Sequence, residues 1–105
     1  MPRKSMQTLS EPMYYVLLAL TKELYGTEIM SEVRRISHDR IKIGPGTLYT
    51  MLDKFLTAGL IKRTNQSLAT KSYIITLEGK RVLKEEYMRL NTLILDGGKI
   101  MEVLI

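Results

Sequence analysis

The sequence predicts a mainly helical α+β domain that continues into a long C-terminal helix. Apolar residues recur at three- and four-residue spacing in four separate stretches, as they do along one face of an α-helix. Two short stretches, residues 60–64 and 71–75, have the composition of β-strands and flank a polar turn. The chain has 105 residues, of which 45% are hydrophobic and 26% charged. These values fit one folded domain and are too small for two independent cores.

The first two helices are recognised by their caps. Ser10, Glu11 and Pro12 form a helix start, because serine caps a helix and proline is tolerated in its first turn. The apolar spacing continues as far as Leu24, so we expect the first helix over residues 11–24. Residues 25–27 interrupt the pattern and cap a second helix, expected over residues 27–37. The alternation in residues 41–43 indicates a very short strand before the third helix.

Residues 44–63, GPGTLYTMLDKFLTAGLIKR, are the most informative stretch. Gly44 is a suitable cap, and Pro45 is a suitable first helical residue because its missing N–H costs nothing there. Gly59 stands where a left-handed residue closes a helix. The apolar side of this third helix is formed by Leu48, Met51, Leu52 and Phe55. Its small polar face, followed by a basic strand, is typical of a helix that reads the DNA major groove, although an ordinary surface helix has the same pattern.

The net charge of +5 is concentrated in one part of the chain. Charges cancel within residues 1–39 and again within residues 72–105. The excess lies in residues 40–71, where Asp53 is the only acid among Arg40, Lys42, Lys54, Lys62, Arg63 and Lys71. Positive charge beside the third helix and the strand after it favours a polyanionic partner, although chance clustering on a basic protein is the alternative.

The last helix, which Thr76 caps, carries a heptad pattern. Its apolar positions alternate in steps of four and three: Leu83, Tyr87, Leu90, Ile94, Gly97, Met101 and Leu104. A helix of about 29 residues is roughly 43 Å long and extends beyond so small a domain. Its outer half therefore needs a partner, for which a second copy of the chain is the simplest choice. The alternative is that Gly97 and Gly98 end the helix and residues 99–105 fold back, which still buries the apolar tail and still favours a homodimer.

This order of elements predicts a winged helix-turn-helix over residues 11–76, after an N-terminal arm of residues 1–10 and before a dimerisation helix over residues 77–105. The candidates for base-edge or adjacent backbone contacts are Thr47, Tyr49, Thr50 and Lys54; for Tyr49 a half-buried structural position fits equally well. The candidates for phosphate contacts are Lys42, Lys62, Arg63 and Lys71, with Asn65 and Gln66 at the wing tip. The candidates for the dimer interface are Leu83, Tyr87, Leu90, Ile94, Met101 and Leu104. Tyr14, Tyr15 and Met88 are candidates for a pocket that takes a flat aromatic ligand, with core packing as the alternative.

Enzymatic chemistry finds little support in the sequence. Cysteine is absent and His38 is the only histidine, so we expect neither a metal site nor a cofactor. Ser37, His38 and Asp39 are consecutive, and neighbours in sequence point in different directions and cannot form a catalytic triad. Residues 44–47 lack the spacing and the lysine of a phosphate-binding loop. No stretch has the length of a membrane span or of a secretory signal, so a cytoplasmic protein is expected.

Five short motifs resemble those of the PadR family of bacterial transcriptional regulators over nearly all of residues 11–105. In chain order they are Leu24-Tyr25-Gly26, Gly46-Thr47-Leu48-Tyr49, Ala58-Gly59-Leu60-Ile61, Lys71-Ser72-Tyr73 and Thr76-Leu77-Glu78-Gly79. The resemblance implies a winged-helix dimer that represses transcription and is released by a small molecule. Two features depart from the family pattern: the wing turn, residues 65–68, is less basic than usual, and the tryptophan with which some members bind aromatic ligands is absent.

We therefore expect a homodimer that binds double-stranded DNA at a pseudo-palindromic operator, with the two third helices about 34 Å apart in successive major grooves. Three alternatives remain at this point: a winged-helix module for protein–protein contact, a DNA-binding protein without sequence preference and, least supported, an enzyme.

Overall fold

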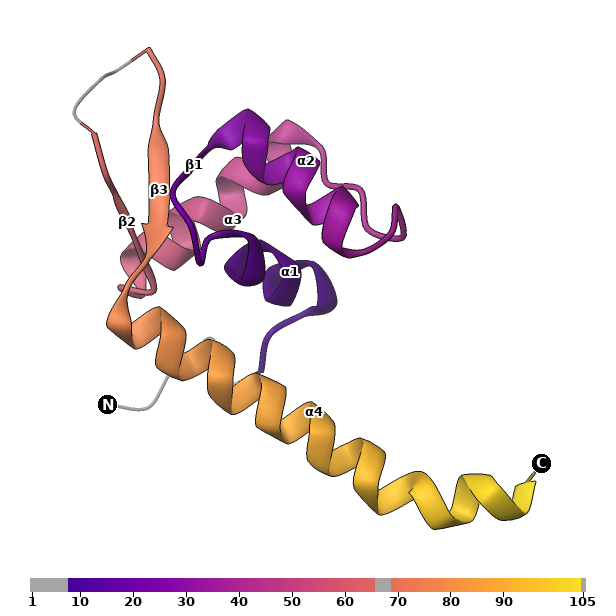
Figure 1. The fold of residues 1–105 in the computed structure, drawn as a ribbon. Coiled ribbons are helices and arrows are strands. Elements are labelled where there is room, and N and C mark those ends of the chain that lie inside the picture. The colour runs from indigo at the N-terminus through magenta and orange to yellow at the C-terminus, as the bar shows by residue number, and fades with distance from the viewer. Residues whose placement is uncertain (1–7, 66–68, 105) are drawn as a thin grey trace.

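A computed structural model describes residues 8–65 and 69–104 of the chain. Most of the expected N-terminal arm, Gln66 of the wing tip and Ile105 lie outside these residues. In chain order, the elements are α1 (Glu11–Ala19), β1 (Leu24–Tyr25), α2 (Gly26–Ile36), α3 (Pro45–Thr57), β2 (Ile61–Arg63), β3 (Ser72–Ile75) and α4 (Leu77–Leu104) (Figure 1). The predicted mainly helical α+β class is confirmed.

Helix α1 begins as expected, but it ends five residues before the predicted boundary. The Ser10 hydroxyl accepts a hydrogen bond from the N–H of Met13 at 3.3 Å, and Pro12 lies in the first turn. After Ala19 the chain turns away, and the carbonyl of Leu20 accepts a hydrogen bond from the N–H of Ile75 at 2.8 Å. Leu24, which fits the helical spacing, belongs instead to β1. The prediction of a helix through Leu24 is therefore wrong, because pairing with a distant strand outweighs the local pattern.

The small sheet has the strand order β1-β3-β2, and both pairs are antiparallel. Leu24 lies opposite Tyr73, and Ile61 lies opposite Ile75. Besides the two strands of the β2–β3 hairpin, the sheet therefore contains β1, which precedes α2. Residues 41–43, predicted as a strand, take no regular secondary structure. Ile43 is nevertheless buried and Lys42 exposed, so these residues alternate between buried and exposed as a strand does, although they pair with no other strand in the described part of the chain.

Helix α3 has the limits that its glycines and proline predict. Gly44 is its N-cap and Pro45 its first residue. At the other end Gly59 has a φ of +76°, a conformation that glycine adopts without strain. The N–H of Leu60 donates to the carbonyl of Phe55 at 2.9 Å, and that of Gly59 donates to Leu56 at 3.1 Å. These two bonds are the Schellman arrangement, which directs the chain straight into β2.

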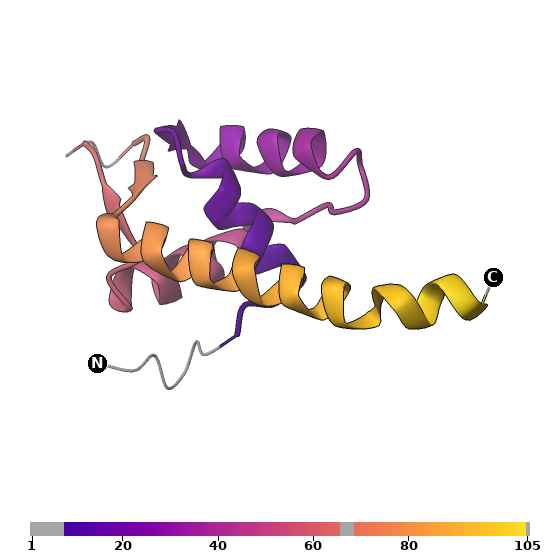
Figure 2. The ribbon, with the colours of Figure 1, turned by 60° about the horizontal axis from the view of Figure 1, so that its bottom comes forward.

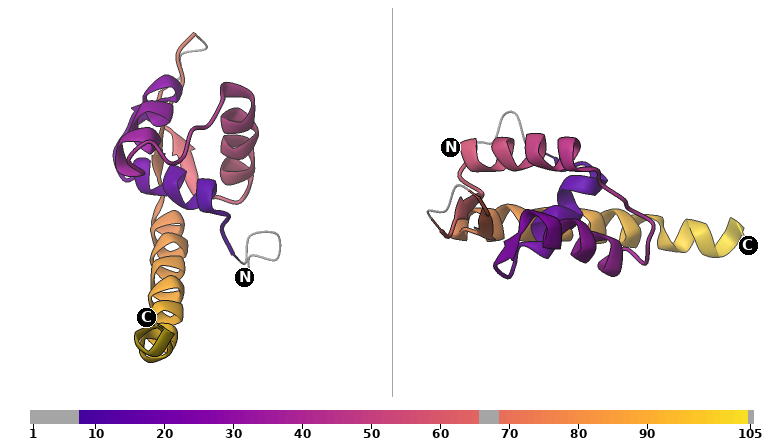
Figure 3. Two further views of the ribbon diagram at one scale, coloured as in Figure 1. Left: turned by 90° about the vertical axis from the view of Figure 1, so that its right-hand side faces the viewer. Right: turned by 90° about the horizontal axis from the view of Figure 1, so that it is seen from above.

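The hydrophobic core lies between α1, α2, α3, the sheet and the first half of α4. Its completely buried members include Leu17, Leu20, Ile29, Leu48, Phe55 and Val82. Helix α3 packs on α2 and β2, whereas α4 packs on α1 and β3. Figure 2 shows α1 between α2 and α4, and Figure 3 shows α3 along one outer side of the domain.

Helix α4 is continuous for 28 residues and passes through Gly97 and Gly98. The alternative in which these glycines end the helix is therefore not adopted. Thr76 caps the helix, since its hydroxyl accepts a hydrogen bond from the N–H of Gly79 at 3.1 Å and donates one to the carbonyl of Gly59 at 2.7 Å. The outer half of α4 projects away from the rest of the domain (Figure 1). Within the described part of the chain, no helix is both long and apolar enough to cross a membrane.

Candidate nucleic-acid interface

Helix α3 has one exposed face, which lies opposite its buried stripe. Gly46, Thr50, Asp53 and Thr57 recur at steps of four and three and are all exposed. Thr47 and Lys54 lie on one flank of this face, and Tyr49 lies on the other. The face is thus made of small and polar side chains, as a surface that enters a groove requires.

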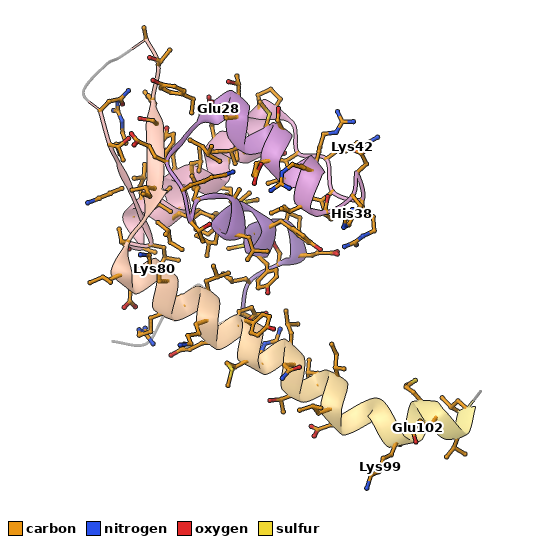
Figure 4. The ribbon with its side chains drawn as sticks, in the orientation of Figure 1. Glu28, His38, Lys42, Lys80, Lys99 and Glu102 are labelled. Atoms are coloured by element: carbon orange, nitrogen blue, oxygen red, sulfur yellow. The ribbon has the colours of Figure 1, made fainter. Side chains whose placement is uncertain are left out.

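Four of the lysines predicted to contact DNA are exposed around this face and along the hairpin: Lys42, Lys54, Lys62 and Lys71. Within residues 8–65 and 69–104, none of the four forms an ion pair. Figure 4 shows Lys42 on the connection between α2 and α3. These charges are therefore available to an external anion.

Arg40 belongs to the same basic stretch of sequence but is engaged elsewhere. Its guanidinium donates a hydrogen bond to the Tyr15 hydroxyl at 2.6 Å, lies 5.8 Å from the centre of the Tyr15 ring and pairs with Glu11 at 3.4 Å. It thus fastens the α2–α3 connection to α1, and its charge is partly neutralised there.

Three of the predicted contact residues of α3 line one cleft. Thr47, Thr50 and Lys54 face Ser10 and Met13 at the beginning of α1, around a volume of about 580 Å³. The first turn of α1 is therefore a neighbour of the groove-reading face, which the sequence pattern did not indicate.

Tyr49 lies on the other flank, against the beginning of α2. A Cβ atom on Gly26 would overlap with the Tyr49 hydroxyl and come within 2.9 Å of its ring carbon Cζ. Burial raises the pKa of the neighbouring Tyr73, and Tyr49 raises it further. Tyr49 thus packs on the beginning of α2 while 41% of it stays exposed.

The hairpin is held in shape by its own polar residues. The Asn65 side chain donates a hydrogen bond to the carbonyl of Thr70 at 2.9 Å and accepts one from the N–H of Ser72 at 3.3 Å. The hydroxyls of Thr64 and Ser72 are 2.5 Å apart. Asn65 therefore shapes the wing, while Arg63 is half-buried on β2.

Most residues of the predicted dimer seam are exposed, but the first is not. Leu83 is buried in the core of its own chain, and Leu90 is half-buried. Tyr87, Ile94, Met101 and Leu104 are between 56% and 71% exposed. A single apolar stripe of α4 thus packs on its own domain in the first half of the helix and is uncovered in the second half.

The predicted effector residues do not gather in one place. Tyr14 lines a cleft of about 230 Å³ between α1 and α4 together with Leu18, Lys80, Leu83, Lys84 and Tyr87. Tyr15 packs edge-on against Tyr14 but is held by Arg40. Met88 is exposed on the side of α4 opposite the buried Leu83 and Glu86. The sequence pattern predicted Tyr87 for the dimer seam and not for this cleft, and it did not indicate the two lysines, which share a flank of α4 with Leu83 and Tyr87.

Ser37, His38 and Asp39 form the turn after α2. The buried Ser37 hydroxyl accepts a hydrogen bond from the N–H of Ile41 at 3.0 Å, and Asp39 pairs with Arg34 at 3.2 Å. His38 and Asp39 have φ angles of 54° and 64°, and Figure 4 shows His38 at the surface. Among the described residues, no group of three histidine, cysteine or acidic side chains is placed to hold a metal ion.

Three helices, a three-stranded sheet with a hairpin, and a small polar face on the third helix with exposed lysines around it define a winged helix-turn-helix protein. The chain belongs to the transcriptional regulator PadR-like family, whose profile matches residues 16–85. This is a family of transcriptional regulators and not of enzymes. No curated protein sequence matches the chain.

Several solved structures are similar to this one. A PadR family transcriptional regulator from Eggerthella lenta DSM 2243 is 26% identical with a TM-score of 0.70, and the match covers 87% of this chain and 81% of that one. A PadR family transcription regulator from hypervirulent Clostridium difficile R20291 is 25% identical with a TM-score of 0.66, covering 85% and 97%. A transcriptional regulator from Clostridium thermocellum shares the fold at 22% identity, with a TM-score of 0.69 and coverage of 85% and 90%.

Proposed function

We propose that this regulator binds double-stranded DNA sequence-specifically, with α3 in the major groove and the β2–β3 hairpin beside it. The observation that carries the proposal is the group of four exposed lysines without acidic partners around α3 and the hairpin. Such a surface gains phosphate contacts and releases counterions. The small polar face of α3 would then meet the base edges, where Thr47 and Thr50 are the proposed contacts and Tyr49 a further one, while Lys54 on its flank would hold an adjacent backbone phosphate.

We further propose that the protein acts as a homodimer joined through α4, and that it represses transcription from a pseudo-palindromic operator. On the outer half of the stripe Ile94, Met101 and Leu104 are between 56% and 71% exposed, which is unfavourable in water. A second copy would cover them and would present a second α3. Two such helices about 34 Å apart match successive major grooves on one side of B-DNA.

Selection of binding sites from random DNA with the purified protein tests this function. We expect an enriched palindrome whose half-site centres are about ten base pairs apart. Equal affinity for random and selected DNA would favour a DNA-binding protein without sequence preference. A stoichiometric protein partner together with no DNA preference would favour a protein–protein module.

The contribution of a single lysine is measurable through its salt dependence. Replacing Lys54 by Ala should weaken operator binding and reduce the slope of log K against log salt by about one unit, because one phosphate contact is lost. Lys99→Ala is the matched control, since Lys99 is an exposed lysine near the far end of α4 (Figure 4). Fluorescence anisotropy between low and moderate salt measures both slopes, and equal slopes in the two variants would contradict the proposed contact.

We also propose that a small aromatic effector releases the protein from DNA. Tyr14 and Tyr87 line the α1–α4 cleft, but its volume of about 230 Å³ is below the roughly 300–1,000 Å³ of usual ligand pockets. A second copy packed on α4 would have to complete such a pocket. Tyr15 and Met88 would line the pocket only in that dimer. Isothermal titration of the dimer with and without Tyr14→Ala tests this site.

A further inference from the structure

Asp53 occupies the centre of the exposed face of α3, between Thr50 and Thr57. It lies opposite the buried Leu48, Leu52 and Phe55 and therefore points away from the domain. A helix that enters the major groove with this face would bring Asp53 closer to the base edges than the flanking Thr47, Lys54 or Tyr49.

The Asp53 carboxylate is unpaired in a basic neighbourhood. Among residues 8–65 and 69–104 it forms no ion pair and no hydrogen bond. Lys54 is its neighbour in sequence. Asp53 and Arg63 act on the same buried hydroxyl, since Asp53 raises the pKa of Tyr73 and Arg63 lowers it. Among the described residues, the acid is thus not bound by any cation of the basic stretch in which it lies.

A free carboxylate on a DNA-binding face lowers the affinity for every sequence, because phosphates repel it. It is compatible with tight binding only where a base offers it a hydrogen-bond donor. A carboxylate accepts hydrogen bonds and donates none.

The major groove narrows the choice of base. Guanine presents two acceptors and thymine presents an acceptor and a methyl group, so neither suits a carboxylate. Adenine offers an amino group next to the acceptor N7, which repels the second carboxylate oxygen. Cytosine offers its N4 amino group without an adjacent acceptor on the same base, and acidic side chains accept from it.

We infer that Asp53 is a specificity-determining residue that accepts a hydrogen bond from the N4 amino group of a cytosine in each half-site. This inference rests on the proposed sequence-specific binding of DNA. Aspartate is short, so α3 must lie deep in the groove. The side chains around Asp53 on this face are small, and a Cβ atom on Gly46 would meet no protein atom within 4 Å.

The test compares the wild type with Asp53→Ala and Asp53→Asn in the same selection from random DNA, followed by affinities for single-base variants of the selected site. In the wild type we expect one symmetric cytosine whose replacement weakens binding roughly ten- to hundred-fold. In Asp53→Ala this position should lose its preference while the others keep theirs. In Asp53→Asn the preference should move to adenine, because an amide pairs with both N6 and N7 of that base.

Asp96→Ala controls for the change in net charge, because Asp96 is an exposed carboxylate on the outer half of α4. It should leave the preference at every position unchanged. A palindrome enriched equally by the wild type and both Asp53 variants would overturn the role of Asp53 and leave the proposed function intact. A wild type that enriches no sequence would overturn the proposed function and this inference with it.

Discussion

Replacing Ile94 by Asp should convert the protein from a dimer to a monomer. Ile94 lies on the apolar stripe of α4, in the half that its own domain does not cover, and it is 70% exposed. In a dimer joined by this stripe, the substitution removes about 1.5–3 kcal/mol of burial per chain and places an unpaired carboxylate in an apolar seam. Because the substitution lies outside the core of the chain, each separate domain should still fold.

The same substitution should also weaken operator binding strongly. Two linked half-site contacts gain roughly 10²–10⁴ in affinity over one, and a monomer loses this gain. Sedimentation velocity over a range of micromolar concentrations measures the assembly, and anisotropy with a full palindrome measures the affinity.

Leu95→Asp is the matched control, because Leu95 is also 70% exposed but lies off the stripe, about 100° around the same helix from Ile94. We expect this variant to remain dimeric and to bind DNA as the wild type does. If both variants stay dimeric, the dimer does not use this stripe. If both become monomeric, the interface surrounds the helix instead of following one side of it.

The order of helices and the limits of α3 could be predicted because local chemistry determines them. Gly44 and Pro45 start α3 and Gly59 closes it, and each acts within a few residues of its own position. Leu24 and residues 41–43 were misassigned for the opposite reason. Whether an apolar stretch becomes a strand depends on a pairing partner that is distant in the sequence. Leu24 pairs with Tyr73 of β3, whereas residues 41–43 pair with no strand among the described residues.

The basic surface could be predicted from the charges, but the position of the individual groups on it could not. Arg40 counts as a free cation in the sequence, whereas the fold pairs it with Glu11 and Tyr15. Periodicity likewise predicts one stripe along α4, but not the point at which its own domain stops covering it. Leu83 lies on the covered side of that point and Ile94 on the other.

Two glycines of the family motifs, Gly26 and Gly79, stand where the packing leaves no room for a side chain, and only the fold shows this. Gly26 leaves room for the ring of Tyr49, which joins the start of α2 to α3. Gly79 leaves room for the carbonyl of Leu60, which joins α4 to the start of β2. Motifs that are far apart in the sequence therefore form pairs in space, and this explains why they occur together.

Replacing Gly79 by Ala should destabilise the fold by about 3 kcal/mol, although alanine is the better helix former. A Cβ atom at this position would overlap with the backbone carbonyl oxygen of Leu60 and lie 2.6 Å from Cγ1 of Ile75. The Leu60 carbonyl cannot rotate away easily, because it accepts a hydrogen bond from the N–H of Thr76 at 2.9 Å, and the Ile75 side chain is buried in the core. The first turn of α4 would have to move away from the sheet, and the core beneath it would loosen.

Gly98→Ala, in the same helix, should have the opposite sign. Nothing lies within 4 Å of a Cβ atom on Gly98, so the change gains about 1 kcal/mol of helix propensity without a clash. Thermal unfolding followed by circular dichroism measures both, at one protein concentration because dimerisation adds to the apparent stability. For a domain of this size, Gly79→Ala should lower the midpoint by roughly 10–20 °C and Gly98→Ala should raise it by a few degrees. The two substitutions would thus differ in sign because Gly79 lies against the backbone carbonyl of Leu60, just before β2, whereas Gly98 lies in open space. Similar shifts in both variants would show that α4 does not pack on Leu60 in this way.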